Sequence, residues 1–216
     1  MSAAQKPTVF LVDDDADVRN AIRLLFKSEG IPLVPHATGK DALKAIGDKP
    51  VGCVLLDLRM AEMDGLEFQK ELLARKLPIP VILLTGHATV PVAVQAVKAG
   101  ALDVIQKPFK DEDLIEAVKH ALEVHAQWQQ SLQERHAAAE RIAELTPREI
   151  QVLDLMVSGM RNKDIAEQLG ISPKTLDIHR ANVMDKMEAR TTADLVRARL
   201  LERADPMALP YIFGMR

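Results

Sequence analysis

Cysteine and aromatic side chains are scarce in this sequence. Cys53 is the only cysteine among 216 residues, and aromatic residues make up 3% of the chain. A single thiol cannot form an internal disulfide or supply the several cysteines of a structural zinc site, so both kinds of scaffold are excluded. Cys53 stands in the apolar run 51–56, where we expect a small buried hydrophobic residue.

Long hydrophobic runs are absent as well. No apolar stretch approaches the roughly 18 to 20 residues that cross a bilayer, and residues 1–7 lack the apolar segment of a signal peptide. We therefore expect a soluble, cytoplasmic protein without a membrane partner.

Hydrophobic residues make up 48% and charged residues 27%, a globular balance that excludes disorder or a rod over the whole chain. The length allows one large domain or two small ones.

The net charge of −3 is distributed unevenly. Residues 1–145 contain 17 Lys and Arg against 21 Asp and Glu, whereas residues 146–216 contain 11 against 10. The two parts therefore carry −4 and +1. The difference has the sign that a C-terminal DNA contact requires, but it is too small to establish one.

Short apolar runs alternate with helical patterns over the first 110 residues. For example, Val18, Ile22 and Phe26 recur at helical spacing between two such runs. The runs predict five short strands, at residues 8–12, 31–35, 51–56, 80–84 and 102–105. Strands that alternate with helices predict an α/β fold with a doubly wound, five-stranded parallel sheet. Ligands of such sheets bind beyond the carboxyl ends of the strands.

Charged and hydroxyl side chains follow the predicted strands at that edge. They are Asp13, Asp14 and Asp15 after the first strand, then Asp57, Thr85 and Lys107 after later ones. Converging carboxylates need a nearby cation to remain ionised, and oxygen ligands beside a hydroxyl and a lysine suit Mg²⁺ and a phosphoryl group. Aspartates at strand ends also cap helices, which fits Asp15 best, although an aspartate of the site could serve both purposes. No helix start follows Asp57 directly, which favours a functional role for it.

Four separated segments resemble the receiver domain of bacterial two-component response regulators, over about residues 6–122. They are Val12-Asp-Asp14, Leu56-Asp57-Leu-Arg-Met-Ala-Glu-Met-Asp-Gly65, Leu84-Thr85-Gly-His87 and Asp103-Val-Ile-Gln-Lys107-Pro-Phe109. The resemblance implies a CheY-like sheet with strand order 2-1-3-4-5. It makes the Lys107-Pro108 bond a candidate cis peptide, although trans is the default for such a bond.

The resemblance also implies roles for the residues at the sheet edge. Asp57 would accept a phosphoryl group from a sensor histidine kinase, with the Thr85 hydroxyl and the Lys107 ammonium binding that group. The implied cofactor is Mg²⁺, held by Asp13, Asp14, Asp57 and the backbone carbonyl of Arg59. Such a receiver catalyses only its own phosphotransfer and dephosphorylation, so the chain is not expected to be an enzyme in the usual sense.

The chain departs from the receiver pattern at two positions. Val104 stands three residues before the lysine, where receivers usually carry Tyr or Phe, and Ala61 stands where the acidic loop usually has proline. Neither change affects the phosphorylation chemistry. Val104 does argue against signalling by rotation of an aromatic ring, which leaves a shift of Thr85 and movement of the following helix as the expected relay.

Residues 111–145 contain no proline or glycine and follow an almost unbroken helical pattern. Written as heptads, the seam includes His125 and Arg135 beside apolar residues, which disfavours a strong coiled coil. A solvated helical spacer is an equally good interpretation. Trp128, the only tryptophan, is expected to pack against a neighbouring element.

Helix signals begin again at Thr146, which forms a capping-box pattern with Glu149. A short helix over 162–169, a turn at Gly170, a longer helix from Pro173 to about residue 188 and a last helix over 192–203 predict a helix-turn-helix. A helical hairpin without a ligand fits the periodicity equally well. The expected core side chains of the last two helices are Leu176, Val183, Met187, Leu195, Val196, Leu200 and Leu201.

Three segments of this region resemble the LuxR-type DNA-binding domain. They are Leu145-Thr-Pro-Arg-Glu149, Asn162-Lys-Asp-Ile-Ala-Glu-Gln-Leu-Gly-Ile-Ser172 and Lys174-Thr-Leu-Asp-Ile-His-Arg-Ala-Asn-Val-Met-Asp-Lys-Met187. Joined to a receiver, they make the chain similar to FixJ/NarL-type transcriptional regulators, in the branch of FixJ- and StyR-like proteins. By the family's pattern, base edges are contacted by Asp177, Ile178 and Ala181, and phosphates by Lys174, Thr175, Arg180, Lys186 and Arg190.

The expected organisation is a receiver (1–122), a helical linker (123–144), a LuxR-type helix-turn-helix domain (145–205) and a tail (206–216). Phosphorylation of Asp57 is expected to promote receiver dimerisation through the surface near the fourth and fifth helices. The dimer would bind a two-fold promoter site and act with RNA polymerase. One alternative is a DNA-binding regulator that works without phosphorylation. Another is an aspartyl-nucleophile phosphatase, which needs a second aspartate where Arg59 stands.

Overall fold

The computed structural model describes residues 6–48, 50–86 and 89–203. The chain divides into two compact units, the first ending at Trp128 and the second beginning at Gln129. A core of buried apolar side chains lies in each unit, so each can be understood from its own sequence.

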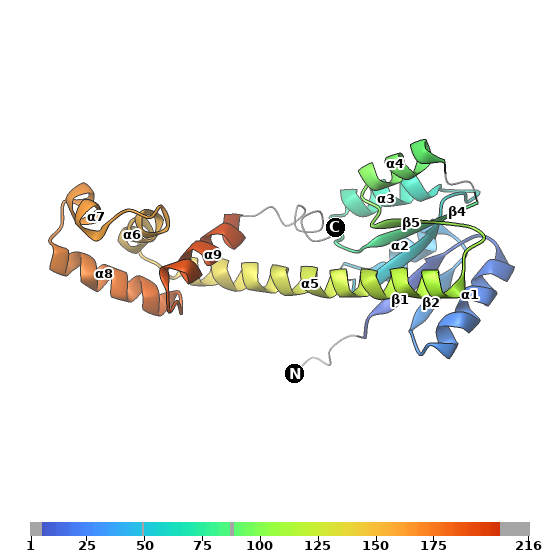
Figure 1. The fold of residues 1–216 in the computed structure, drawn as a ribbon, viewed down its shortest axis with the longest axis horizontal. Helices are drawn as coiled ribbons and strands as arrows, with labels where there is room; N and C mark the ends of the chain where they lie inside the picture. Colours follow the sequence, from blue (N-terminus) through green and yellow to red (C-terminus); the bar gives the residue numbers. More distant parts are fainter. Residues whose placement is uncertain (1–5, 49, 87–88, 204–216) are drawn as a thin grey trace. The chain divides into compact units, whose positions relative to one another are not determined.

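A parallel sheet forms the centre of the first unit (Figure 1). Its strands are β1 (Thr8–Val12), β2 (Leu33–His36), β3 (Gly52–Asp57), β4 (Val81–Thr85) and β5 (Asp103–Gln106). They lie in the order β2-β1-β3-β4-β5, and every neighbouring pair is parallel. The predicted α/β fold and strand order are confirmed, and each strand lies within two residues of its expected position.

Helices cover both faces of this sheet. The first turns of α5 (Asp111–Ala143) and α1 (Ala16–Ser28) pack on one face, while α2 (Gly39–Ile46), α3 (Gly65–Ala74) and α4 (Val90–Lys98) pack on the other (Figure 1). Successive strand residues point to opposite faces, so Leu55 belongs to the core under α1 and α5 and Leu56 to the core under α2 and α3. This double burial explains why β3 is a continuous apolar run.

Local hydrogen bonds set the loops at the carboxyl edge of the sheet. Asp15 caps α1 by accepting from the N–H groups of Asp17 and Val18. Asp64 and Glu67 form a capping box at the start of α3. Asp15 is therefore the capping aspartate that the sequence analysis favoured.

The helix α5 is continuous over 33 residues and crosses the boundary between the two units. Within the first unit it buries His125, whose Nε2 lies 3.1 Å from the carbonyl oxygen of Pro50. The rings of His125 and Trp128 make an edge contact with centroids 6.3 Å apart, and Trp128 is 6% exposed. Trp128 is thus packed, as the sequence predicted.

The described part of the second unit contains α6 (Pro147–Val157), α7 (Asn162–Leu169), α8 (Pro173–Lys186) and α9 (Thr192–Arg203). Gly170 ends α7 at φ 62°, a left-handed conformation that glycine adopts without strain. Ser172 then caps α8 by accepting from the N–H of Thr175. A helix, a glycine turn and a longer helix form the predicted helix-turn-helix.

The core of this unit contains most of the residues predicted for it. Leu176, Val183 and Met187 of α8 and its C-cap are buried, and so is Leu195 of α9. The prediction for Leu200 was wrong, because that side chain is 65% exposed. Five residues after Leu195, at 3.6 residues per turn, Leu200 points about 140° away from it around the helix axis.

Candidate functional site

Polar side chains from β1, β3 and β4 meet at the carboxyl edge of the sheet. Asp13 follows β1, Asp57 is the last residue of β3 and Thr85 is the last residue of β4. All three are buried, with exposed fractions of 1%, 8% and 2%. Since β1 and β4 both pair with β3, the sheet register brings these strand ends together.

Lys107 brings the only ammonium group among the predicted residues of this edge. Its Nζ lies 2.7 Å from Oδ2 of Asp13 and 2.6 Å from Oδ1 of Asp57. Its backbone N–H donates to the carbonyl of Thr85 at 2.7 Å, and the Lys107-Pro108 peptide bond that follows is cis, as in the receiver pattern. The ammonium group thus neutralises two carboxylates that would otherwise repel each other.

Burial and charge act against each other in this cluster. Burial raises the pKa of Asp57, and the hydrogen bond and positive charge of Lys107 reduce that rise without cancelling it. Burial also works to lower the pKa of Lys107, but its bonds to Asp13 and Asp57 outweigh burial and raise that pKa. Lys107 therefore stays protonated and places its positive charge beside the carboxyl groups of Asp13 and Asp57.

Asp14 is exposed and points to the loop after β3. Its Oδ2 accepts a hydrogen bond from the N–H of Ala61 at 3.1 Å. The N–H of Arg59 in the same loop donates to Oδ2 of Asp57 at 2.9 Å. The bond from Ala61 therefore joins the loop after β3 to the loop after β1, and the bond from Arg59 holds Asp57 within its own loop.

The donor set at this edge suits Mg²⁺ by its chemistry. Asp13, Asp14, Asp57 and the Arg59 carbonyl would supply only oxygen ligands, which is what a hard divalent cation prefers. Among the described residues, however, no three His, Cys, Asp or Glu side chains are arranged as a metal cluster. Lys107 provides the positive charge between Asp13 and Asp57 in the arrangement seen here. These residues can hold Mg²⁺ if Lys107 shares the carboxylates with it.

One residue of this edge was missed by sequence reasoning. Arg19 of α1 donates from Nη1 to the backbone carbonyl of Asp13 at 2.7 Å. No recognised sequence motif places an arginine six residues after an aspartate, so the sequence did not point to Arg19. Only the turn at the start of α1, fixed by Asp15, places the two close together.

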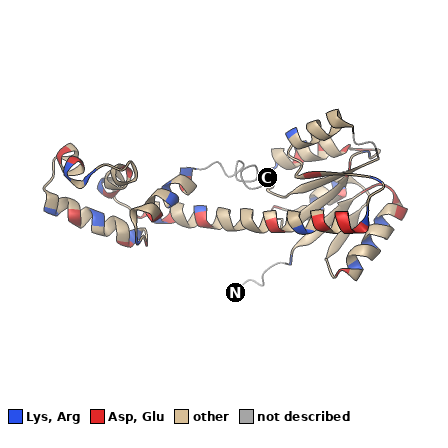
Figure 2. Cartoon of the chain, viewed as in Figure 1, with Lys and Arg blue, Asp and Glu red and all other residues tan. Residues whose placement is uncertain are grey.

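The predicted DNA-contacting residues, which lie on α8 except for Arg190 just after it, fall into two groups. Most are exposed to solvent: Lys174, Thr175, Asp177, Ile178, Ala181 and Arg190. Ile178 is 56% exposed, which is unusual for a large apolar side chain and consistent with a contact surface. Figure 2 shows Lys and Arg spaced along α8, whereas acidic residues gather at the start of α5.

The other two predicted contacts, Arg180 and Lys186, are engaged within the unit. The Arg180 guanidinium donates to the side-chain oxygen of Asn162 at the start of α7. Lys186 Nζ lies 2.7 Å from Oε2 of Glu149 and 3.3 Å from the carbonyl of Glu144. Glu149 is 3% exposed, and its bonds to Lys186 and Thr146 lower its pKa to about 2. A phosphate contact by Lys186 would compete with this ion pair.

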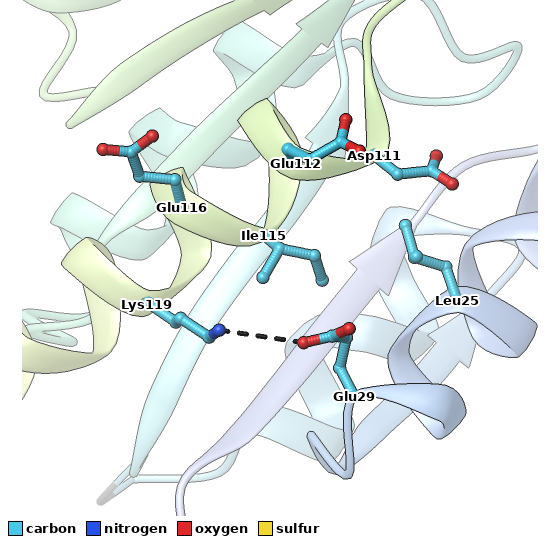
Figure 3. A pocket seen from close by; sticks show the side chains of 7 residues that line it. All are labelled: Leu25, Glu29, Asp111, Glu112, Ile115, Glu116 and Lys119. Atoms are coloured by element: carbon cyan, nitrogen blue, oxygen red, sulfur yellow. Dashed lines mark ion pairs between the residues drawn. The ribbon is translucent and has the colours of Figure 1, made fainter.

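Two pockets lie beside α1 and α5. Leu25, Ile115 and acidic side chains line one of them, and Lys119 and Glu29, which also line it, form an ion pair at 3.7 Å (Figure 3). This pocket contains none of the predicted site residues. The second is lined partly by Lys107 and Phe109, so its wall reaches from α1 to the carboxyl edge of the sheet.

Comparison with family models identifies both parts of the chain. Residues 9–119 match the response regulator receiver domain, and residues 143–198 match the bacterial regulatory proteins of the luxR family. Over the part of the chain that the structure describes, no helix is both long and apolar enough to cross a bilayer.

Whole-chain relatives are found among curated proteins and solved structures. The transcriptional regulatory protein FixJ of Azorhizobium caulinodans is 42% identical over 92% of this chain and 94% of its own length. The C4-dicarboxylate transport transcriptional regulatory protein DctR of Rhodobacter capsulatus is 44% identical over 88% of this chain and 98% of its own length. The response regulator StyR matches with a TM-score of 0.75 and 37% identity, covering 90% of this chain and 98% of that one.

Proposed function

Because the chain belongs to the FixJ-type two-component response regulators, in which a receiver precedes a LuxR-type DNA-binding domain, we propose that phosphorylation of Asp57 by a sensor histidine kinase controls its binding to promoter DNA. The chain is a transcriptional regulator. What we propose in addition is which residues perform the phosphorylation switch, that Mg²⁺ binds among them, and which partners the chain has.

The observation that carries the proposal is the position of Lys107 between Asp13 and Asp57. An oxygen of Asp57 forms a bond to phosphorus while the bond from phosphorus to the kinase histidine breaks, and the histidine nitrogen keeps the electron pair. Lys107 collects negative charge on the phosphoryl oxygens. Asp13, Asp14, Asp57 and the Arg59 carbonyl would hold Mg²⁺, which would supply further charge stabilisation. The receiver thus catalyses only its own phosphorylation and the loss of the phosphoryl group.

Phosphorylation changes what Lys107 and Thr85 bind. The Asp57 oxygen that accepts from Lys107 becomes part of an acyl phosphate, and the new dianion attracts both the ammonium and the Thr85 hydroxyl. Thr85 is the last residue of β4 and is followed by the segment that leads into α4. A shift of Thr85 therefore moves the start of α4, and the half-buried Val104 of β5 provides no aromatic ring to carry the signal.

The surface of α4 supports dimerisation as the response. Val90, Val94 and Val97 lie at helical spacing and are 78%, 46% and 49% exposed. Three neighbouring apolar side chains on one helix face are costly in water and are typical of a surface that is covered in another state. Two phosphorylated receivers that pair through this face would link two DNA-binding modules, which raises affinity for a two-fold site.

The DNA contacts remain as the sequence predicts them. Residues 1–122 form the receiver, 123–144 the linker and 145–205 the DNA-binding domain, with 206–216 as a tail outside the described residues. The exposed Asp177, Ile178 and Ala181 face base edges, and the exposed Lys174, Thr175 and Arg190 reach phosphates. Arg180 and Lys186 reach phosphates only if they leave Asn162 and Glu149. RNA polymerase is the expected partner at the promoter, which places the action in the cytoplasm.

Selection of binding sites from random duplex DNA tests the proposal. The wild-type chain and Asp57→Ala are compared at one salt concentration, each with and without Mg²⁺ and beryllofluoride, a mimic of the acyl phosphate. We expect a two-fold motif to be enriched only when the mimic meets intact Asp57. Equal enrichment in all conditions would instead establish the phosphorylation-independent regulator.

The phosphatase alternative makes a different prediction. Arg59 stands where an aspartyl-nucleophile phosphatase needs its acid and base, so a phosphate monoester should not be turned over. Continuous release of phosphate from such a substrate would overturn the regulator mechanism at Asp57. A single phosphoryl transfer that stops at Asp57 supports it.

A further inference from the structure

Arg19 reaches back from α1 to the loop that carries the acidic pair. The residue is half-buried, its backbone N–H continues the helix by donating to the Asp15 carbonyl, and its Nη1 donates to the Asp13 carbonyl at 2.7 Å. That distance is short for an N–H···O bond and is typical of a charged donor. The guanidinium of Arg19 is therefore bound to the loop before α1 and is not a freely solvated surface charge.

Every polar atom of Asp13 has a partner. Its N–H donates to the carbonyl of His36, and its Oδ1 accepts from the N–H of Asp15 at 2.9 Å. Its Oδ2 accepts from Lys107, and its carbonyl accepts from Arg19. Asp13 is 1% exposed, so water cannot easily replace any of these partners.

The Asp13 carbonyl belongs to the peptide plane that joins Asp13 to Asp14. Because the peptide unit is planar, fixing its oxygen also fixes the direction of the Asp14 N–H and limits how the Asp14 side chain leaves the backbone. Asp14 is held from the far side only by one bond to the Ala61 N–H. The Arg19 bond therefore restrains the peptide that joins the two aspartates.

We infer that Arg19 is a positioning residue for the acidic pair, which it sets for Mg²⁺ through the peptide between Asp13 and Asp14. The inference rests on the proposed function, since Mg²⁺ binding at this edge is part of it. Arg19 also carries a positive charge, which by itself repels Mg²⁺. Loss of the guanidinium should weaken Mg²⁺ binding if Arg19 acts by positioning the acidic pair, and strengthen it if Arg19 acts only by its charge. The direction of the change in Mg²⁺ affinity therefore separates the two effects.

The test measures Mg²⁺ binding to the full chain by titration calorimetry with no phosphodonor present. Arg19→Met removes the donor, Arg19→Lys keeps the charge without the planar fork, and Arg23→Met is the matched control. Arg23 lies one turn further along α1 and is exposed, and its side chain makes no hydrogen bond or ion pair with any described residue. Thermal unfolding of each variant is followed in parallel, and the amide NMR signal of Asp14 reports on the peptide plane.

Arg19→Met should weaken Mg²⁺ binding about tenfold, at the lower end of what losing an outer-shell partner of a metal site costs. Arg19→Lys should fall between it and the wild type, and Arg23→Met should match the wild type. The Asp14 amide signal should shift in Arg19→Met before any metal is added and stay in place in Arg23→Met.

Unchanged or tighter Mg²⁺ binding in Arg19→Met would overturn the positioning role, tighter binding being the signature of a charge effect alone. If Arg19→Met lacks a cooperative unfolding transition, Arg19→Gln serves as the neutral variant under the same criterion. A wild-type chain that binds no Mg²⁺ and takes no phosphoryl group from acetyl phosphate would remove the proposed function, and the positioning role with it. A wild-type chain that does both, beside variants identical to it, removes only the positioning role.

Discussion

Lys186 Nζ lies 2.7 Å from Oε2 of Glu149, so the last turn of α8 is joined to the first turn of α6 by an ion pair. Glu149 closes the capping box with Thr146, and the same lysine donates to the carbonyl of Glu144. One side chain thus connects the end of the predicted recognition helix with the segment that leaves α5. The pair is internal, which bears directly on how Lys186 contributes to DNA binding.

Salt dependence distinguishes an internal lysine from a phosphate contact. Lys174→Met should reduce the slope of log affinity against log salt by about 0.9 per subunit, because one phosphate contact and its counterion release are lost. Lys186→Met should weaken binding to duplex DNA with little change of slope if the ion pair is its main role. Anisotropy titrations at four salt concentrations measure both. Equal losses of slope would place Lys186 on a phosphate.

The stability of the second unit should depend on the ionisation of Glu149. Its pKa of about 2 lies below the ordinary 4.5, so the ion pair stabilises the folded state fully above about pH 4.5 and is lost as pH falls toward 2. At pH 7, Glu149→Gln should cost about 1 to 3 kcal/mol, reduced by the partial exposure of Lys186. Urea unfolding at several pH values checks this. A difference from the wild type that does not shrink below pH 4 would contradict it.

The buried His125 and the partly buried His36 should make the first unit less stable in mild acid. Burial lowers the pKa of His125 below 6.5, opposed by its bond to Pro50, and burial also lowers the pKa of His36. As pH falls below about 6.5, the histidines of the unfolded chain take up protons before those of the folded chain. The free energy of unfolding therefore falls, by at most about 1.4 kcal/mol per pH unit for each histidine.

Trp128 offers the measurement, since it is the only tryptophan and contacts His125. Urea unfolding followed by its fluorescence should give a loss of stability between pH 7 and 5.5 in the wild type. In His125→Gln the loss should be smaller, because the contribution of His125 is removed. Parallel stability curves for the two chains would show that His125 does not titrate as the structure requires.

Much of this molecule follows from local sequence patterns. The strand runs and the connections between them predicted the sheet edge where Asp57 and Lys107 meet, because parallel strands end on one side. Capping residues such as Asp15 and Thr146 bind N–H groups within three residues of their own position, so they can also be predicted from the sequence. The family pattern supplied the roles that periodicity could not.

What the sequence did not predict depends on contacts between distant residues. The pair of Glu149 and Lys186 spans 37 positions, and no local spacing connects them. Arg19 contacts the backbone carbonyl of residue 13, a group that every residue type has. The contact therefore leaves no recognisable side-chain pattern in the sequence. Leu200 was misplaced because an apolar residue on a short helix was assumed to face the core, whereas its angle around the axis decides its burial.

Gly52 should be irreplaceable at the start of β3. A Cβ at this position would lie 1.8 Å from the carbonyl oxygen of Thr8, its partner on β1, and φ is 141°. Gly52→Ala should therefore either fail to fold or lose more than about 3 kcal/mol, because backbone and not a flexible side chain must move. Gly30→Ala is the matched control, with φ 69° and nothing within 4 Å of the added carbon. It should cost about 1 kcal/mol in urea unfolding, and similar losses in both variants would contradict the clash.

A charge on the α4 face should separate phosphorylation from dimerisation. Val94 is 46% exposed between Val90 and Val97, so Val94→Asp leaves the core intact but places a carboxylate in each half of the proposed interface. With Mg²⁺ and beryllofluoride, the wild type should dimerise in light scattering, whereas Val94→Asp should stay monomeric and still react with acetyl phosphate at the wild-type rate. Leu24→Asp carries the same new charge on α1, where the side chain is 62% exposed, and should dimerise normally. A dimer of Val94→Asp as stable as the wild type would move the interface to another face, and a slowed reaction at Asp57 would mean that α4 and the phosphorylation edge are coupled even before two chains meet.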